Sequence, residues 1–214
     1  MFISFPEAQN YFRQPEKIII SGNPVRAEFV AGDRKAHEGF RLLVCGGSLG
    51  AEMINNSAIE LIKRHPDIIV DFVTGKRYYD EIKAKVDAIE GSSNFVNLID
   101  YETDMHSRMA IADMVISRSG AITLSEILAM GLPAIFVPSP NVTGNHQYHN
   151  AKSVADAGAG LLVEEKELKN DIGVIADKVL DFSKNKESLY NMGIRARNIA
   201  KLDAADIIWK NIQN

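Results

Sequence analysis

Short apolar runs alternate with amphipathic stretches along most of the chain, and this alternation restricts the fold more than any other feature of the sequence. The run at 42–45 predicts a buried strand, and residues 51–64 carry apolar side chains at helical spacing. The cycle then recurs, with expected strands at 68–73, 95–99, 114–117, 134–137 and 160–163 and expected helices at 78–89, 106–112, 122–130 and 147–157. Such alternation predicts an α/β fold, a Rossmann-like parallel sheet with helices on both faces.

The two ends of the chain do not follow this cycle. Ile18–Ile20 is a short β-branched run, and the residues at 21–24 are typical of a turn. The polar stretch 31–39 predicts a surface loop or linker, and residues 165–213 show helical periodicity only. The regular strand–helix unit is therefore expected between about residue 40 and the C-terminal helices.

Composition excludes several classes of protein. The chain has 214 residues, of which 46% are apolar and 24% charged, so a disordered, collagen-like or coiled-coil protein is not expected. With 24 Lys and Arg against 28 Asp and Glu, the net charge is −4, and nucleic acid is not an expected partner. The chain opens without a secretory signal, and prolines interrupt its longest uncharged stretch, so we expect a cytoplasmic protein without a membrane-spanning helix.

Neither a disulfide nor a metal site is expected. Cys45 is the only cysteine and ends a predicted strand, where a small core side chain is the simpler interpretation than a nucleophile. His146 and His149 are three residues apart, but no nearby carboxylate or cysteine completes a set of metal ligands. The sequence therefore predicts no metal and no cofactor.

Three turns between a strand and the following helix carry unusual chemistry, and the first is glycine-rich. Gly46–Gly50 (GGSLG) would let backbone amides approach a phosphate at the start of a helix. The pattern is neither a dinucleotide-binding nor a Walker A motif. A tight turn required only for packing explains the glycines equally well.

The second turn contains Ser119, Gly120 and Ala121, which would present backbone amides at a helix start. Glu126 lies one to two turns into that helix, where a carboxylate could accept hydrogen bonds from two neighbouring hydroxyls, as on a ribose. A simpler alternative is that Ser119 or Thr123 caps the helix and that Glu126 favours its positive end.

The third turn is a long polar loop, 138–146, that runs into a helix beginning near Gln147. Gln147 and Asn150 are three residues apart on that helix, so both amides can face one ligand. Neutral side chains that both donate and accept hydrogen bonds suit sugar hydroxyls. An ordinary surface loop with Asn145 as a cap is the alternative.

Together these turns resemble the MurG family of UDP-N-acetylglucosamine transferases, which make the lipid-linked precursor of peptidoglycan. The matching stretches, in the family's order and spacing, are SGNPVR (21–26), GGSLGA (46–51), SRSGAITLSEILAMGLPAIFVPSP (117–140) and NHQYHNA (145–151). The resemblance implies the C-terminal half of a GT-B glycosyltransferase, in which two Rossmann-like domains face each other across a cleft. It implies a remnant of the N-terminal domain and a linker at 1–24, and the UDP-GlcNAc donor-binding domain at 25–214.

Carried over position by position, the resemblance implies a donor site in this chain. Gly47 and Ser48 would contact the phosphates, and Arg26 would reach the donor from the linker. Ile99 would flank the uracil with its backbone reading the base edge, and Glu126 would bind the ribose hydroxyls.

The remaining implied contacts surround the diphosphate and the sugar. They are Ser119, Gly120, Ala121 and Thr123 at the diphosphate and sugar, and His146, Gln147 and Asn150 at the N-acetylglucosamine. Two stretches depart from the family: the stretch Asp100–Met105 is longer than usual, and Glu52 replaces a common basic residue. The first departure affects the expected uracil contact.

The implied reaction is the inverting transfer of N-acetylglucosamine from UDP to undecaprenyl-pyrophosphoryl-MurNAc-pentapeptide, which converts lipid I into lipid II in peptidoglycan synthesis, a process linked to cell shape and division. The family's N-terminal glycine-rich motif, which serves acceptor and catalysis, has no counterpart in the sequence. No catalytic residue is therefore expected in this chain, which should bind the donor without turning it over.

The expected partners are UDP-GlcNAc and, through the N-terminal domain, the lipid-linked acceptor at the cytoplasmic face of the inner membrane. The absence of an Asp-x-Asp pair agrees with a reaction that needs no divalent metal. Two alternatives remain open: a non-catalytic UDP-sugar-binding subunit of a split glycosyltransferase, and an isomerase like the UDP-GlcNAc 2-epimerases, which share the fold.

Overall fold

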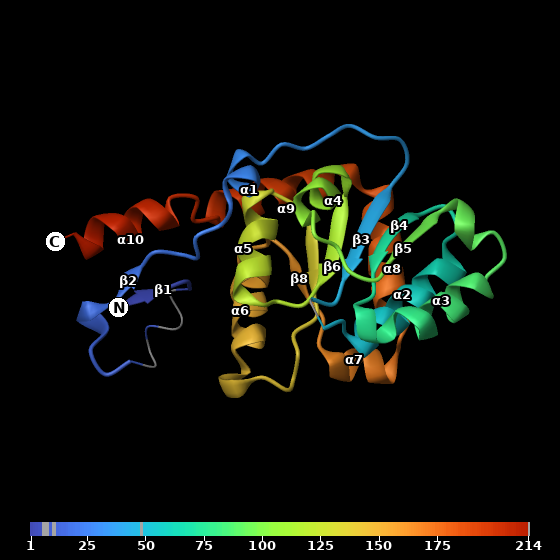
Figure 1. Ribbon diagram of the computed structural model, residues 1–214, viewed down its shortest axis with the longest axis horizontal. Coiled ribbons are helices and arrows are strands. Elements are labelled where there is room, and N and C mark those ends of the chain that lie inside the picture. The colour runs from blue at the N-terminus through green and yellow to red at the C-terminus, as the bar shows by residue number, and fades with distance from the viewer. Residues whose placement is uncertain (6–8, 10–11, 48, 214) are drawn as a thin grey trace.

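The computed structural model describes residues 1–5, 9, 12–47 and 49–213. Within these residues, a parallel sheet of six strands in the order β5-β4-β3-β6-β7-β8 forms the centre of the molecule (Figure 1). The strands are β3 (Arg41–Cys45), β4 (Ile69–Val73), β5 (Val96–Ile99), β6 (Met114–Ser117), β7 (Ala134–Phe136) and β8 (Leu161–Leu162). The predicted parallel α/β sheet is confirmed, and its strand order reverses between β3 and β6, as in doubly wound folds.

Helices cover both faces of this sheet. The α-helices that follow β3 are α2 (Glu52–Arg64), α3 (Tyr79–Asp87), α4 (Met105–Ile111), α5 (Ala121–Ala129), α6 (His146–Asp156), α7 (Glu165–Asn170), α8 (Val174–Lys184), α9 (Lys186–Ile199) and α10 (Ala204–Ile212). Short 3-10 turns lie at η3 (Lys76–Tyr78), η4 (Ser92–Asn94) and η5 (Thr143–Asn145). Within the described part of the chain, none of these helices is long and apolar enough to cross a lipid bilayer.

The alternation of side chains along each strand produces two cores. Leu42 and Val44 of β3 belong to a cluster with α2, α3, α7 and α8, whereas Leu43 and Cys45 belong to a cluster with α1, α5 and α6. Figure 1 shows α5 and α6 on one side of the sheet and α2 and α3 on the other. Because both faces are buried, the strands read as continuous apolar runs.

The N-terminal segment forms a small sheet of its own. Strands β1 (Phe2–Ile3) and β2 (Ile19–Ile20) pair in parallel, with the 3-10 turn η2 (Pro15–Lys17) before β2. Figure 1 shows this sheet beside α10, away from the six-stranded sheet. The domain boundary at residue 24 stays a prediction, although this separate sheet agrees with it.

One helix, α1 (Ala27–Ala31), has no counterpart among the predicted elements. It has only five residues, too few for a helical period to be visible, and it ends at Gly32 with φ of 68°. Its Phe29 is fully buried in the second core, and α1 packs against α5. Tertiary packing of one aromatic side chain therefore stabilises this helix, because isolated helices this short are not stable.

The buried ring of Phe72 in β4 provides a test of the first core. Phe72→Ala is expected to lower the free energy of unfolding by about 3–5 kcal/mol, because it removes a fully buried aromatic side chain and leaves a cavity. Tyr190→Ala, whose ring is 70% exposed, should change it by less than about 0.5 kcal/mol. Urea denaturation of both variants measures the difference, and equal effects would contradict this assignment of the core.

Candidate functional site

The three chemically unusual turns lie at one edge of the sheet, where the strands end. Cys45 at the end of β3 pairs with Ser117 at the end of β6, and Ser117 pairs with Phe136 at the end of β7. The turn after β3 and the turn after β6 therefore lie side by side, at the point where the strand order reverses. Ligands of open parallel sheets bind at this point.

The glycine-rich turn after β3 combines a packing role with an open surface. Gly50, at φ of 74°, is pressed against β4, since an added Cβ would lie 2.3 Å from the carbonyl oxygen of Thr74. Gly47, at φ of 85°, has no atom within 4 Å of such a Cβ, so its backbone faces open space. The packing role is thus shown at Gly50, whereas phosphate binding at Gly47 stays a prediction; Ser48 lies outside the described residues.

The turn after β6 also presents open backbone. Gly120 is the residue before α5, and nothing lies within 4 Å of a Cβ added to it. Within the described residues no side chain caps α5, so the alternative in which Ser119 or Thr123 caps this helix is wrong. The first amides of α5, including that of Ala121, are therefore free for a ligand, and the helix dipole favours a negative one.

Ser119 and Asn150 connect the second turn to the third. The hydroxyl of the buried Ser119 donates to the carbonyl oxygen of Gln147 over 2.7 Å, and the side-chain amide of Asn150 donates to the carbonyl oxygen of Ser119 over 3.1 Å. The Ser139 amide donates to Gln147 Oε1 over 2.9 Å. Among the described residues none accepts from the amide nitrogen of Gln147, so Gln147 keeps donors for a ligand.

Glu126 and Arg26 face each other across the linker. Arg26 Nη2 lies 3.5 Å from Glu126 Oε1 and Arg26 Nη1 lies 3.3 Å from Glu28 Oε1, while the guanidinium stacks 4.6 Å above the centre of the Phe29 ring. Burial raises the pKa of Glu126, and the charge of Arg26 opposes that rise. Asn23 anchors the linker by donating to the Ala121 carbonyl oxygen over 3.0 Å.

The third turn carries a strained residue beside His146. Asn145 has φ of 51° at the start of α6, a conformation that side chains other than glycine rarely adopt. His146 is exposed, and its Nδ1 lies 2.9 Å from the carbonyl oxygen of Thr143. Strain of this kind is concentrated at functional sites. In the described part of the chain no group of three His, Cys, Asp or Glu side chains could hold a metal ion.

Cys45 lies beneath the two adjacent turns. Its thiol is buried and donates to the Ser117 hydroxyl over 3.4 Å. Burial raises the pKa of Cys45 to about 11, so the thiol stays protonated at neutral pH and is a poor nucleophile. This geometry supports the interpretation of Cys45 as a core residue.

The carbonyl oxygen of Ile99 takes part in the hydrogen bonding between β4 and β5. The oxygen accepts from the Thr74 amide over 2.9 Å, and the Thr74 hydroxyl lies 3.3 Å from both this oxygen and the Gly75 carbonyl oxygen, so its single proton serves one of the two. Beyond Ile99, a hollow of about 390 Å³ is lined by Leu49, Lys76, Arg77 and Tyr101. Leu49 belongs to the glycine-rich turn and Tyr101 to the long stretch after Ile99, whereas no sequence signal marked Lys76 and Arg77.

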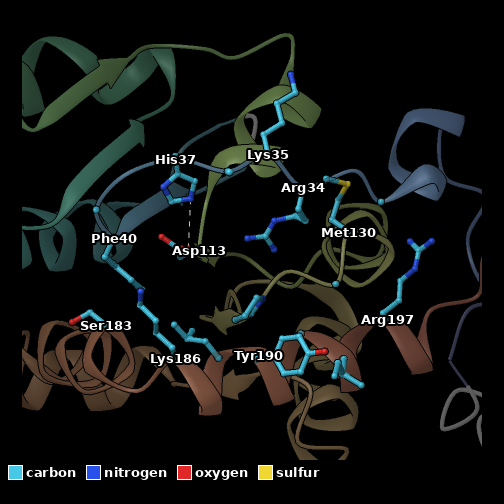
Figure 2. Close-up of a pocket in the computed structure, with 18 of the residues that line it drawn as sticks. Arg34, Lys35, His37, Phe40, Asp113, Met130, Ser183, Lys186, Tyr190 and Arg197 are labelled. Atoms are coloured by element: carbon cyan, nitrogen blue, oxygen red, sulfur yellow. Dashed lines mark ion pairs between the residues drawn. The ribbon is translucent and has the colours of Figure 1, made fainter.

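A larger cavity of about 920 Å³ lies at the opposite edge, where the strands begin (Figure 2). It lies between the loop after α1 and helix α9, and Figure 2 shows Arg34 reaching into it, with His37 Nε2 3.6 Å from Asp113 Oδ1. At its margin Arg197 donates to the Val30 carbonyl oxygen over 2.7 Å and to that of Ala129, closing the ends of α1 and α5. None of the predicted site residues lines this cavity.

The pKa of Glu126 leads to a test by stability. Because burial raises the folded-state pKa above the unfolded one, this carboxyl stabilises the fold at low pH, and that contribution is lost as the pH rises through the folded-state pKa. Glu126→Gln stays neutral, so its unfolding free energy should exceed that of the wild type by a margin that widens from about pH 4 to about pH 8. Urea denaturation of both proteins at both pH values measures this difference in unfolding free energy. A difference that becomes smaller as the pH rises would contradict the burial of Glu126.

Comparison with known proteins identifies relatives over nearly the whole chain. The sequence profile described as the glycosyltransferase family 28 C-terminal domain matches residues 41–208. A relative from Acetivibrio thermocellus is 36% identical over 99% of this chain and 59% of its own length. One from Alkaliphilus metalliredigens is 33% identical over 98% of this chain and 60% of its own length. Both are named UDP-N-acetylglucosamine–N-acetylmuramyl-(pentapeptide) pyrophosphoryl-undecaprenol N-acetylglucosamine transferase.

Solved structures agree with this likeness. The crystal structure of Acinetobacter baumannii MurG is 25% identical and superposes with a TM-score of 0.77, over 99% of this chain and 59% of that one. UDP-GlcNAc 2-epimerase from Neisseria meningitidis, bound to UDP-GlcNAc, shares the fold with a TM-score of 0.59 at 16% identity, over 84% of this chain and 46% of that one. The chain thus spans about three fifths of the length of the curated relatives it matches, and it belongs to glycosyltransferase family 28, whose C-terminal domain it contains.

Proposed function

We propose that this chain is the donor-binding domain of a MurG-type transferase and binds UDP-N-acetylglucosamine across the turns after β3, β6 and β7. The observation that carries the proposal is the pair of adjacent turns at the strand reversal, in which Gly47 and Gly120 both face open space. Two backbone surfaces without side chains, one of them at the positive end of α5, suit a diphosphate.

The other groups at this edge suit the remaining parts of a nucleotide sugar. Glu126 can accept hydrogen bonds from the two ribose hydroxyls, provided that Arg26 moves from its carboxylate to the diphosphate. Gln147 offers its free amide donors to the hydroxyls or the acetamido group of the sugar. The buried Ser119 and Asn150 contribute indirectly. Their hydrogen bonds hold the turn after β6 against α6 and so keep Gln147 in position.

The site supplies one half of the chemistry of glycosyl transfer. When an acceptor hydroxyl attacks the anomeric carbon, the bond to UDP breaks and negative charge grows on the diphosphate. The amides of α5, the backbone of Gly47 and the guanidinium of Arg26 can stabilise that charge without a metal ion. We place the general base and the lipid-linked acceptor on the other domain of such an enzyme, at the membrane surface, and propose that this chain alone does not catalyse transfer.

Calorimetric titration with UDP-N-acetylglucosamine, without added metal, tests donor binding. We expect saturable binding by the wild type, weakened about ten- to hundredfold in Glu126→Ala, because the charged hydrogen bonds to the ribose are lost. Glu187→Ala is the control, since Glu187 is exposed on α9. Wild-type protein that does not bind the donor, or a control as weak as Glu126→Ala, would refute the proposed site.

A second titration separates the sugar contact from the nucleotide contact. Gln147→Ala should weaken UDP-N-acetylglucosamine binding severalfold and leave UDP binding unchanged, because Gln147 faces only the sugar. Glu126→Ala should weaken both ligands equally. Loss of UDP affinity in Gln147→Ala would place this side chain elsewhere on the donor.

Product analysis distinguishes the transferase from the isomerase that shares the fold. Incubation of the chain with UDP-N-acetylglucosamine alone should leave the donor intact. Release of UDP-N-acetylmannosamine or free 2-acetamidoglucal would favour an epimerase instead.

A further inference from the structure

The cavity shown in Figure 2 lies at the edge of the sheet opposite the proposed donor site. Its volume of about 920 Å³ is in the range of sites that hold small organic ligands. The chain from Arg41 to Cys45 in β3 separates the two edges by about 13 Å. Gly47, Gly120 and Glu126 do not line the cavity, so a ligand in it would leave the donor site open.

One wall of the cavity is the loop that follows α1, and this loop is fixed to the body of the domain. The sequence predicts only a surface loop or linker at 31–39. In the structure the Lys35 amide donates to the Ala110 carbonyl oxygen over 2.8 Å, and Arg34 donates from Nη2 to the Ala112 carbonyl oxygen. The loop is therefore held against the segment that leads into β6, which gives the cavity a built wall.

The other wall is α9, which presents apolar side chains to the cavity. Tyr190 is 70% exposed and Ile194 is 41% exposed, and their spacing of four residues places them on one face of the helix. The helix is closely packed there, since a Cβ on Gly193 would lie 2.6 Å from the Gly131 carbonyl oxygen. This wall therefore offers bare apolar surface on a fixed support.

Two cations extend into the space between these walls. Figure 2 shows Arg34 pointing in from the loop and Lys186 from the start of α9, whereas Lys35 points away. Within the described part of the chain, no carboxylate forms an ion pair with Arg34 or Lys186. Desolvation lowers the pKa of Arg34, and the charge of Asp113 opposes that change. Both cations are therefore available to an anion from solution.

Asp113 is the one carboxylate among the described residues that line the cavity, and it is already engaged. Its Oδ2 accepts from the Arg41 amide over 2.8 Å, and its Oδ1 lies 3.6 Å from His37 Nε2. The carboxylate thus serves the start of β3 and the loop. Positive charge is in excess in the cavity, although the chain as a whole carries a net charge of −4.

We propose that this cavity binds a small phosphate monoester that carries an apolar or aromatic group. The phosphate lies between Arg34 and Lys186, because its charge of about −1.5 to −2 at neutral pH matches two cations. The organic group rests on Tyr190 and Ile194. A carboxylate has a single charge and would leave one cation unpaired, so the site favours the phosphate. This site does not depend on the donor-binding function proposed above.

Chemical-shift titration of the intact chain with phenyl phosphate tests the site. The amide signals of Gly131 and Gly193 should shift saturably, because both residues line the cavity. With excess UDP-N-acetylglucosamine present, these signals should still shift and report the same affinity, since the two sites are separate. Signals of Gly131 and Gly193 that do not respond, or a loss of affinity when UDP-N-acetylglucosamine is present, would overturn the proposal.

Removal of either cation should weaken phenyl phosphate binding. Lys186→Met removes an exposed charge and should weaken binding about three- to tenfold, whereas Arg34→Met loses charged hydrogen bonds and should weaken it about tenfold or more. Lys63→Met, on the exposed face of α2, is the matched control and should bind like the wild type. Thermal unfolding establishes that each variant is folded. Wild-type affinity in Lys186→Met, or an equal loss in Lys63→Met, would refute the site.

Simpler anions separate the two parts of the ligand. Inorganic phosphate lacks the ring and benzoate has one negative charge, so each should bind severalfold more weakly than phenyl phosphate. Tyr190→Ala should weaken phenyl phosphate binding severalfold and leave inorganic phosphate binding unchanged, while Trp209→Ala, which removes an exposed ring on α10, should change neither. Inorganic phosphate that binds as tightly as phenyl phosphate would overturn the apolar contact, and benzoate that does so would overturn the assignment to a dianion.

Discussion

The pairing of β3 with β6 is the interaction on which the site depends. Its register sets Cys45 opposite Ser117, so that two turns separated by about seventy residues in the sequence open side by side. The apolar side chains on both faces of these strands maintain that register, because a shift of one residue would exchange the two cores. This pairing brings the open backbone at Gly47 and the open backbone at Gly120 to the same place on the surface.

The polar groups at this edge divide into those that hold the site and those left for a ligand. Ser119 and Asn150 are buried and bonded to backbone, so they act as braces between the second and third turns. Partial burial raises the pKa of Glu126, and the charge of the nearby Arg26 opposes that rise. Under the proposed function, the ribose hydroxyls replace that ion pair with hydrogen bonds and Arg26 moves to a phosphate.

Sequence reasoning located the strands, most helices and the glycine-rich turns, because apolar periodicity and glycine each carry a local physical signal. It misassigned Ser119 or Thr123 as a possible cap, because residue type does not reveal that the Ser119 hydroxyl bonds to Gln147, 28 residues away. It missed helix α1, which depends on burial of Phe29 against α5.

Local patterns were sufficient to predict the α/β class, the parallel sheet and the family, because each follows from residues that are close together along the chain. Which groups at the edge are free, in contrast, depends on contacts between segments that are distant in the sequence. Hydrogen bonds between distant segments occupy the Ser119 hydroxyl, the Asn150 amide and the Ile99 carbonyl oxygen. Availability to a ligand is a property of long-range contacts, and no local pattern of residues encodes it.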